Sequence, residues 1–255
     1  EQIDGCDTWD TSQSLDFASI FSHCRKLKSV DVSNWNTSNA NSLYYLFRDC
    51  NSLEAIDVSN WNVKNVTNMS NAFRGCSVLS ELDISNWEVN KLSDISSMFE
   101  GCTQLTTLNL SHFNTTNVTN MCALFKNCTS LTTLDISNFN TTKVTTLASM
   151  FENCAKLTTL NLSHFETPDL TDASAMFKNC TSLTSLNISN LQVDVEDTVT
   201  EMLYGVPSSV NISLLTDKFN KNELDCSFEG AFDWTIVGEF ARYVGNAVPS
   251  TCTIS

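Results

Sequence analysis

The sequence repeats itself every 26 residues, and this period constrains the fold more than any other feature. Each repeat carries one cysteine, with no insertion between copies, at Cys24, Cys50, Cys76, Cys102, Cys128, Cys154 and Cys180. A phenylalanine precedes each of these cysteines by three residues, and a leucine follows each by three residues. A unit this short cannot bury its apolar side chains alone, so neighbouring copies must cover one another. The period therefore predicts a stack in which equivalent residues form columns.

Each repeat contains two short element patterns. Residues 131–136, Leu-Thr-Thr-Leu-Asp-Ile, end in apolar and polar alternation, which is typical of a strand with one buried face. Residues 66–75 have apolar side chains near helical spacing, between a possible N-cap and a possible left-handed C-cap. The N-cap positions are Thr67, Ser93, Thr119, Thr145 and Thr171, and the C-cap positions are Gly75, Gly101, Asn127, Asn153 and Asn179. The sequence thus predicts an α/β solenoid with a parallel β-sheet and short helices.

The repeats divide the chain into three parts. Shifting the period back from Trp35 reaches Trp9, so we expect an N-terminal cap over residues 1–8 and a solenoid over residues 9–204. Residues 205–255 depart from the repeat but keep several aromatic side chains, which favours a folded C-terminal cap. Cys226 and Cys252 lie in this cap, and we expect a disulfide between them if the chain is exported.

Composition excludes several classes of function. The chain has 14 basic and 29 acidic residues, a net charge of −15, which argues against binding to nucleic acid or to an anionic membrane surface. It has no run of 18 apolar residues, so we expect no membrane insertion. The first residues lack the basic start and apolar core of a signal peptide, and we interpret the sequence as a mature or trimmed form of an exported protein.

The repeat resembles a known class. Its unit is Phe-x-x-Cys-x-x-Leu-x-x-Leu-Asp-hydrophobic-Ser-Asn-Trp/Phe, followed by Val-Thr-Asn-Met. This unit, over about residues 9–204, resembles the BspA-like leucine-rich repeats of surface proteins from bacteria, mycoplasmas and some protists. The resemblance implies a curved solenoid of the leucine-rich-repeat type on a cell surface, often acting in adhesion to molecules of a host or a partner cell.

Nothing in the sequence predicts catalysis, a cofactor or a metal site. The cysteine column lacks CxxC spacing and nearby histidines, and cysteine packs well as a small apolar side chain, so we interpret the column as structural. His112 and His164 occupy a position that is asparagine in other repeats, and two repeats separate them, which is too far to share an ion. Hydrolase elbows, phosphate loops and HExxH motifs do not occur.

One polar column is predicted to point outward from the sheet. We call it the Asp/Asn column, and it consists of Asp31, Asp57, Asp83, Asn109, Asp135, Asn161 and Asn187. Its first three members are like charges on neighbouring strands, an arrangement that a bound partner or cation would stabilise. The column is either a recognition strip or a set of side chains that form local hydrogen bonds at the ends of the strands.

These observations predict an extracellular or cell-surface binding module. We expect adhesion to a protein or glycan of a host or neighbouring cell through the exposed sheet face. The alternative is a structural spacer or envelope component with no soluble ligand, and a secreted effector with an intracellular partner is a third hypothesis.

Overall fold

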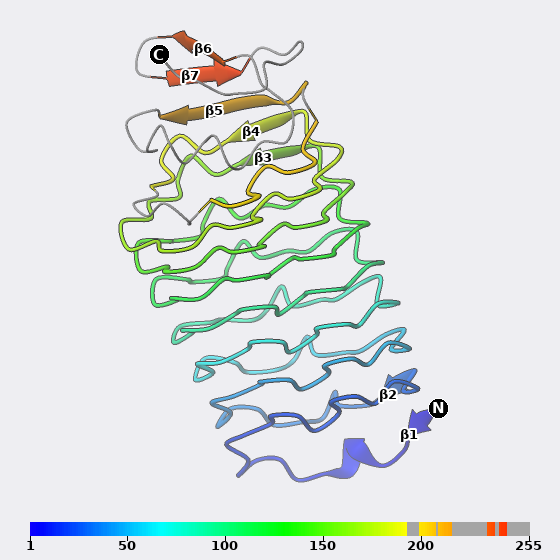
Figure 1. The fold of residues 1–255 in the computed structure, drawn as a ribbon. Coiled ribbons are helices and arrows are strands. Elements are labelled where there is room, and N and C mark those ends of the chain that lie inside the picture. Colours follow the sequence, from blue (N-terminus) through cyan, green and yellow to red (C-terminus); the bar gives the residue numbers. More distant parts are fainter. Residues whose placement is uncertain (193–198, 208, 216–233, 238–239, 244–255) are drawn as a thin grey trace.

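The computed structural model of this 255-residue chain describes residues 1–192, 199–207, 209–215, 234–237 and 240–243. Its successive 26-residue coils lie one above another from the N-terminal end towards the C-terminal end (Figure 1). Within the described residues, the one helix is the short 3₁₀ helix η1 (Cys6–Thr8). No helix in this described part is long and apolar enough to cross a bilayer.

The regular strands lie at the two ends of the stack. At the N-terminal end, β1 (Gln2–Ile3) pairs in parallel with β2 (Ser29–Val30). Between these ends, an isolated parallel bridge from Asn109 to Asp135 joins neighbouring coils on the strand side, whereas six others run along the opposite side of the coils, from Asp16 to Asp172. The predicted parallel pairing is therefore present, but with less continuous strand than the alternation of residues suggests.

A five-stranded sheet closes the C-terminal end of the described structure. Its order is β3-β4-β5-β7-β6, from β3 (Thr159–Asn161), β4 (Ser185–Asn187), β5 (Asn211–Leu215), β7 (Phe240–Tyr243) and β6 (Trp234–Val237). The first three strands are parallel and their partners are 26 residues apart, whereas β7 is antiparallel to both β5 and β6. The described parts of the expected C-terminal cap thus extend the sheet of the repeats.

The predicted short helices are wrong. In the segment 66–75, backbone N–H groups donate to carbonyls of the next coil, from Met69 to Asp94 at 3.0 Å and from Phe73 to Met98 at 3.0 Å. The residue between them, Asn71, has a φ of 59°, and residues at the same position in the other coils are also left-handed. This backbone directs its N–H groups along the stack, where a neighbouring coil accepts them, instead of towards the fourth residue before. Apolar spacing alone does not distinguish the two arrangements.

The residues expected to cap those helices have other roles. The Thr67 hydroxyl donates to the carbonyl of Asn41 in the preceding coil at 3.2 Å, and the Ser93 hydroxyl donates to Thr67 at 3.0 Å. The left-handed conformation expected before each cysteine is confirmed, with φ of 73° at Gly75 and 61° at Asn127. The turn signal was therefore correct, although no helix precedes it.

Columns of identical side chains fill the interior, as the period predicts. The phenylalanine column is buried, and its successive rings lie 5.2–6.2 Å apart between centroids, in near-parallel stacks from Phe21 to Phe177. A second column stacks Trp9, Trp35, Trp61 and Trp87 at 5.8–6.3 Å. The hydrophobic core is therefore continuous along the described repeats.

The cysteine column is part of this core. Six of its thiols donate to the carbonyl of a phenylalanine 29 residues earlier, as Cys102 does to Phe73 at 3.2 Å. Burial raises the pKa of the Cys102 thiol to about 12. These thiols are protonated, bonded and enclosed, which agrees with a structural role. Cys226 and Cys252 lie outside the described residues.

Truncation of one ring in the phenylalanine column should destabilise the stack. We expect Phe99→Ala to lower the free energy of unfolding by about 3–5 kcal/mol, because it opens a cavity between two coils that cannot close up. Urea denaturation followed by circular dichroism measures the change. A midpoint equal to that of the wild type would remove Phe99 from the core.

The thiols should differ in reactivity according to burial. Burial raises the pKa of both the Cys102 and the Cys122 thiol, but Cys122 is only partly buried. In the native protein at pH 8, we therefore expect a thiolate-selective reagent to leave Cys102 unmodified and to label Cys122 slowly. Peptide mapping by mass spectrometry, before and after denaturation, separates the two sites. Native labelling of Cys102 at the rate of Cys122 would contradict the enclosed column.

Candidate recognition surface on the strand side

The Asp/Asn column lies on the surface of the strand side, and all its members make the same local turn. In Asp31, Asp57 and Asp83, Oδ1 accepts the backbone N–H of the serine two residues later at 3.0–3.1 Å. The serine hydroxyl donates to the same oxygen at 2.6–2.7 Å. Asn109, Asp135, Asn161 and Asn187 also accept the N–H two residues on. Asparagine and aspartate are interchangeable in this turn because both offer Oδ1.

These local bonds lower the pKa of three aspartates in the column. The serine hydroxyl and backbone N–H stabilise the charged carboxylate, which lowers the pKa of Asp31, Asp83 and Asp135. The bonds occupy Oδ1 and leave Oδ2 without a hydrogen bond within the described chain. Asp31, Asp83 and Asp135 thus each present one ionised oxygen to solvent, and the role of this oxygen in binding stays a prediction.

Two shallow hollows follow the column. One, of about 430 Å³, is lined by Asn109 and Asp135 together with Thr107, Leu108, Thr133, Leu134 and Thr159. The other, of about 380 Å³, is lined by Asp31 and Asp57 together with Gln2, Ser29, Val30, Ala55 and Ile56. The structure therefore brings column residues of adjacent coils together in pairs, beside rows of small hydroxyl and apolar side chains.

The segment directly after the Asp/Asn column, such as Asn60-Trp61, forms the corner of each coil. Its hydrogen-bond pattern was not predicted from the sequence. In the coils with tryptophan, the indole N–H donates to a strand-end carbonyl of the preceding coil, as Trp61 does to Val32 at 3.2 Å and Trp87 to Val58 at 2.9 Å. Phe113 has no such donor, and there His112 Nε2 contacts the equivalent carbonyl of Ile84 at 2.8 Å. A carbonyl only accepts, so this Nε2 carries the proton.

The same replacement occurs in the next two coils. Asn138 Nδ2 donates to Leu110 at 3.1 Å, and His164 Nε2 contacts Ile136 at 2.9 Å. His112 and His164 thus each supply a hydrogen bond that phenylalanine cannot make. The sequence contains this pattern, because both histidines directly precede a phenylalanine, whereas asparagine precedes Trp35, Trp61 and Trp87.

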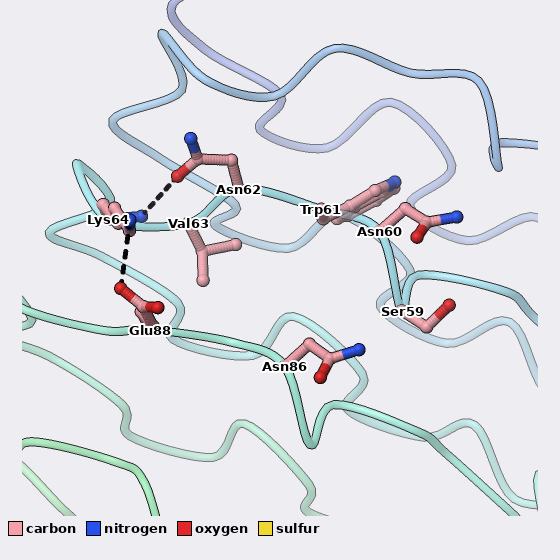
Figure 2. A pocket seen from close by; sticks show the side chains of 8 residues that line it. All are labelled: Ser59, Asn60, Trp61, Asn62, Val63, Lys64, Asn86 and Glu88. Atoms are coloured by element: carbon pink, nitrogen blue, oxygen red, sulfur yellow. Dashed lines mark hydrogen bonds and ion pairs between the residues drawn. The ribbon is translucent and has the colours of Figure 1, made fainter.

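In the coils that contain tryptophan, the indole bonds to this carbonyl, so the side-chain amide of the preceding asparagine is left free. Where the indole serves the carbonyl, the side chains of Asn60 and Asn86 are exposed and make no hydrogen bond in the part of the chain that the structure describes. Figure 2 shows these two amides on successive coils, with Ser59 and the edge of Trp61 beside Asn60. They line a hollow of about 300 Å³ whose far side holds the ion pair of Lys64 with Glu88 at 3.0 Å. The polar surface therefore continues round the corner.

The hydrogen bond to the strand-end carbonyl should form with either an indole or an imidazole as its donor. We expect Trp61→Phe to cost about 0.5–1.5 kcal/mol through loss of the bond to Val32, in addition to a packing loss. Adding Asn60→His should recover part of that cost, because the imidazole then occupies the place that His112 has beside Phe113. A double-mutant cycle by urea denaturation measures the coupling. Additive effects of the two changes would contradict the exchange.

Comparisons with known proteins bear on the family and not on the ligand. Among solved structures, seven chains match this one. One is the crystal structure of a TLR13–ssRNA13 complex, with 16% sequence identity and a TM-score of 0.29. The match covers 74% of this chain and 32% of that chain, so the present chain spans about a third of its length. No curated protein matches the sequence.

A family model matches most of the chain. It is described as a Mycoplasma protein of unknown function, DUF285, and it matches twice, over residues 1–108 and 94–215. Both matches fall on the repeated coils, and together they include the whole Asp/Asn column. This chain therefore belongs to the DUF285 family.

Proposed function

We propose that the chain is an extracellular or cell-surface binding module, a solenoid of the BspA-like leucine-rich-repeat type that adheres to a protein or glycan of a host or neighbouring cell. The observation that carries this proposal is the set of carboxylate Oδ2 atoms that Asp31, Asp57, Asp83 and Asp135 leave free along the Asp/Asn column. They line hollows that pair Asp31 with Asp57 and Asp135 with Asn109, whose side-chain amide adds a donor. Hydroxyl and amide N–H donors of a glycan or a polypeptide fit such a surface.

The chemistry of the rest of the chain supports the same function. A net charge of −15 disfavours a nucleic acid partner. Six of the column thiols donate hydrogen bonds, and burial raises their pKa, which disfavours a role in redox chemistry. His112 and His164 are both bonded to the backbone. We therefore propose a protein that binds without catalysis or a cofactor.

A structural spacer or envelope component is the second candidate. The observation that favours it is the uniform local turn, in which all seven column residues use Oδ1 in the same way. A column that served only this turn would accept aspartate or asparagine equally, as the chain does. The charge of the aspartates separates the two candidates.

The test removes the charge and keeps the turn. In the triple variant Asp31→Asn, Asp57→Asn and Asp83→Asn, each side chain retains Oδ1, as Asn109 does, and we expect an unchanged melting temperature. Binding of the purified chain to cells and to an array of matrix proteins and glycans is the measurement. We expect saturable binding of the wild type and a loss of at least about tenfold in the variant, or about 1.4 kcal/mol.

A matched control exists on the opposite side of each coil. Asp16, Asp94 and Asp172 accept the N–H two residues on at 2.8 Å, and asparagine occupies their position at Asn68 and Asn120. Changing these three to asparagine alters the net charge equally and should leave binding intact. Equal losses in both variants would indicate a general charge effect, and no binding by the wild type would favour the spacer.

A further inference from the structure

The hollow of about 300 Å³ that Asn60 and Asn86 line, here called the corner hollow, is almost wholly polar. Its two apolar members, Trp61 and Val63, are themselves buried. Asn60 and Asn86 bring their free amides to it from successive coils (Figure 2). A carboxamide both donates and accepts hydrogen bonds, so the hollow offers both kinds of group. It suits a ligand that is itself rich in hydrogen-bonding groups.

A backbone N–H at the corner hollow lacks the partner that its counterparts have. In the preceding pair of coils, the Thr37 hydroxyl accepts the N–H of Asn62 at 2.8 Å and donates to its carbonyl at 3.1 Å. Three other threonines of this column do the same. Val63 replaces the threonine in the next coil, so the carbonyl of Glu88 loses this donor, and its N–H has no hydrogen-bond partner among the described residues. The missing group is a hydroxyl, and both Val63 and Glu88 line the hollow.

The neighbouring pairs of coils do not combine these features. In the pair before the hollow, the Thr37 hydroxyl is present and bonds the backbone. In the pair after it, Val89 again replaces the threonine, but a parallel bridge to Phe113 joins the two coils. His112 also replaces the second asparagine there, and its ring is bonded to the backbone. Within the described repeats, two free corner amides and an N–H without a partner therefore meet at this hollow alone.

We propose that the corner hollow is a binding site for one neutral sugar ring. A hydroxyl donates and accepts at once, as that of Thr37 does one coil earlier, so a sugar hydroxyl can accept the N–H of Glu88. Other hydroxyls of the same ring then bond to the amides of Asn60 and Asn86. Ligand pockets have volumes of about 300 to 1,000 Å³, and this hollow is at the lower limit, which suits a single ring.

The charges around the hollow favour a neutral sugar over an acidic one. Lys64 and Glu88 form an ion pair at its far side and leave the site without net charge, while the whole chain carries −15. The choice of a sugar rests on the proposed function, adhesion to a glycan, but the hollow includes no residue of the Asp/Asn column. The two proposals are therefore tested separately.

The probes are the methyl glycosides of glucose, galactose, mannose and N-acetylglucosamine, added to the full chain labelled with nitrogen-15. The side-chain amide resonances of Asn60 and Asn86, identified by their loss in Asn60→Ala and Asn86→Ala, should shift and saturate with at least one glycoside. We expect a dissociation constant of about 1–10 mM, because the hollow is small and offers few apolar contacts. No saturable shift with any of these glycosides up to about 50 mM would overturn the proposal.

A variant that supplies the missing hydroxyl should compete with the sugar. We expect Val63→Thr to weaken glycoside binding at least about fivefold and to keep the fold, since Thr37 is buried at the same position one coil earlier. Asn86→Ala should weaken binding as much at an unchanged melting temperature, because its exposed side chain makes no hydrogen bond within the described chain. The matched control is Asn34→Ala, which removes an exposed corner amide one coil before the hollow. Unweakened binding by Val63→Thr, or an equal loss in Asn34→Ala, would contradict the site.

The same titration distinguishes the sugar site from the adhesion proposal. In the triple variant Asp31→Asn, Asp57→Asn and Asp83→Asn, the shifts of Asn60 and Asn86 should persist. Saturable shifts in a chain that binds neither cells nor the array would support the sugar site while the adhesion proposal failed. Cell binding without such shifts would overturn the sugar site and leave the adhesion proposal standing. Loss of the shifts in the triple variant would overturn it too, because the sugar would then bind at the Asp/Asn column.

Discussion

Backbone hydrogen bonding between coils is the interaction on which the rest of this structure depends. In the segment opposite the strands, alternate N–H groups donate to carbonyls one coil further on, and each coil serves its neighbour in the same direction. A buried peptide group without a partner is costly, so this ladder holds every coil at one register to the next. The register in turn aligns the phenylalanine rings, the thiols and the Asp/Asn column. The left-handed residues of each coil, such as Asn71 and Ala123, are strained, and the bonds to the next coil offset that strain.

The corner of each coil shows how a repeat tolerates substitution. One strand-end carbonyl must find a donor, and the chain meets this need with an indole in some coils and with an imidazole or an amide in others. The two positions change together because they serve one acceptor. The consequence reaches the surface, since the tryptophan coils free Asn60 and Asn86 while the later coils turn the equivalent side chains inward. The polar surface is therefore not uniform along the stack.

The Asp/Asn column combines a structural and a proposed functional role in one side chain. Oδ1 closes a turn that asparagine closes equally well, so the turn alone does not explain why four of the seven residues are aspartate. The remaining oxygen is ionised and exposed, and it lines hollows shared between neighbouring coils.

The sequence by itself determined the 26-residue period, the buried columns and the left-handed turn before each cysteine, because exact repetition puts identical side chains in identical surroundings. It did not determine the segment 66–75, where apolar spacing near that of a helix suits a helix and a stacked turn equally. Only the neighbouring coil decided between them, by accepting N–H groups that a helix would have bonded internally. The partnership of His112 with Ile84 likewise depended on which residue the stack places 28 positions away.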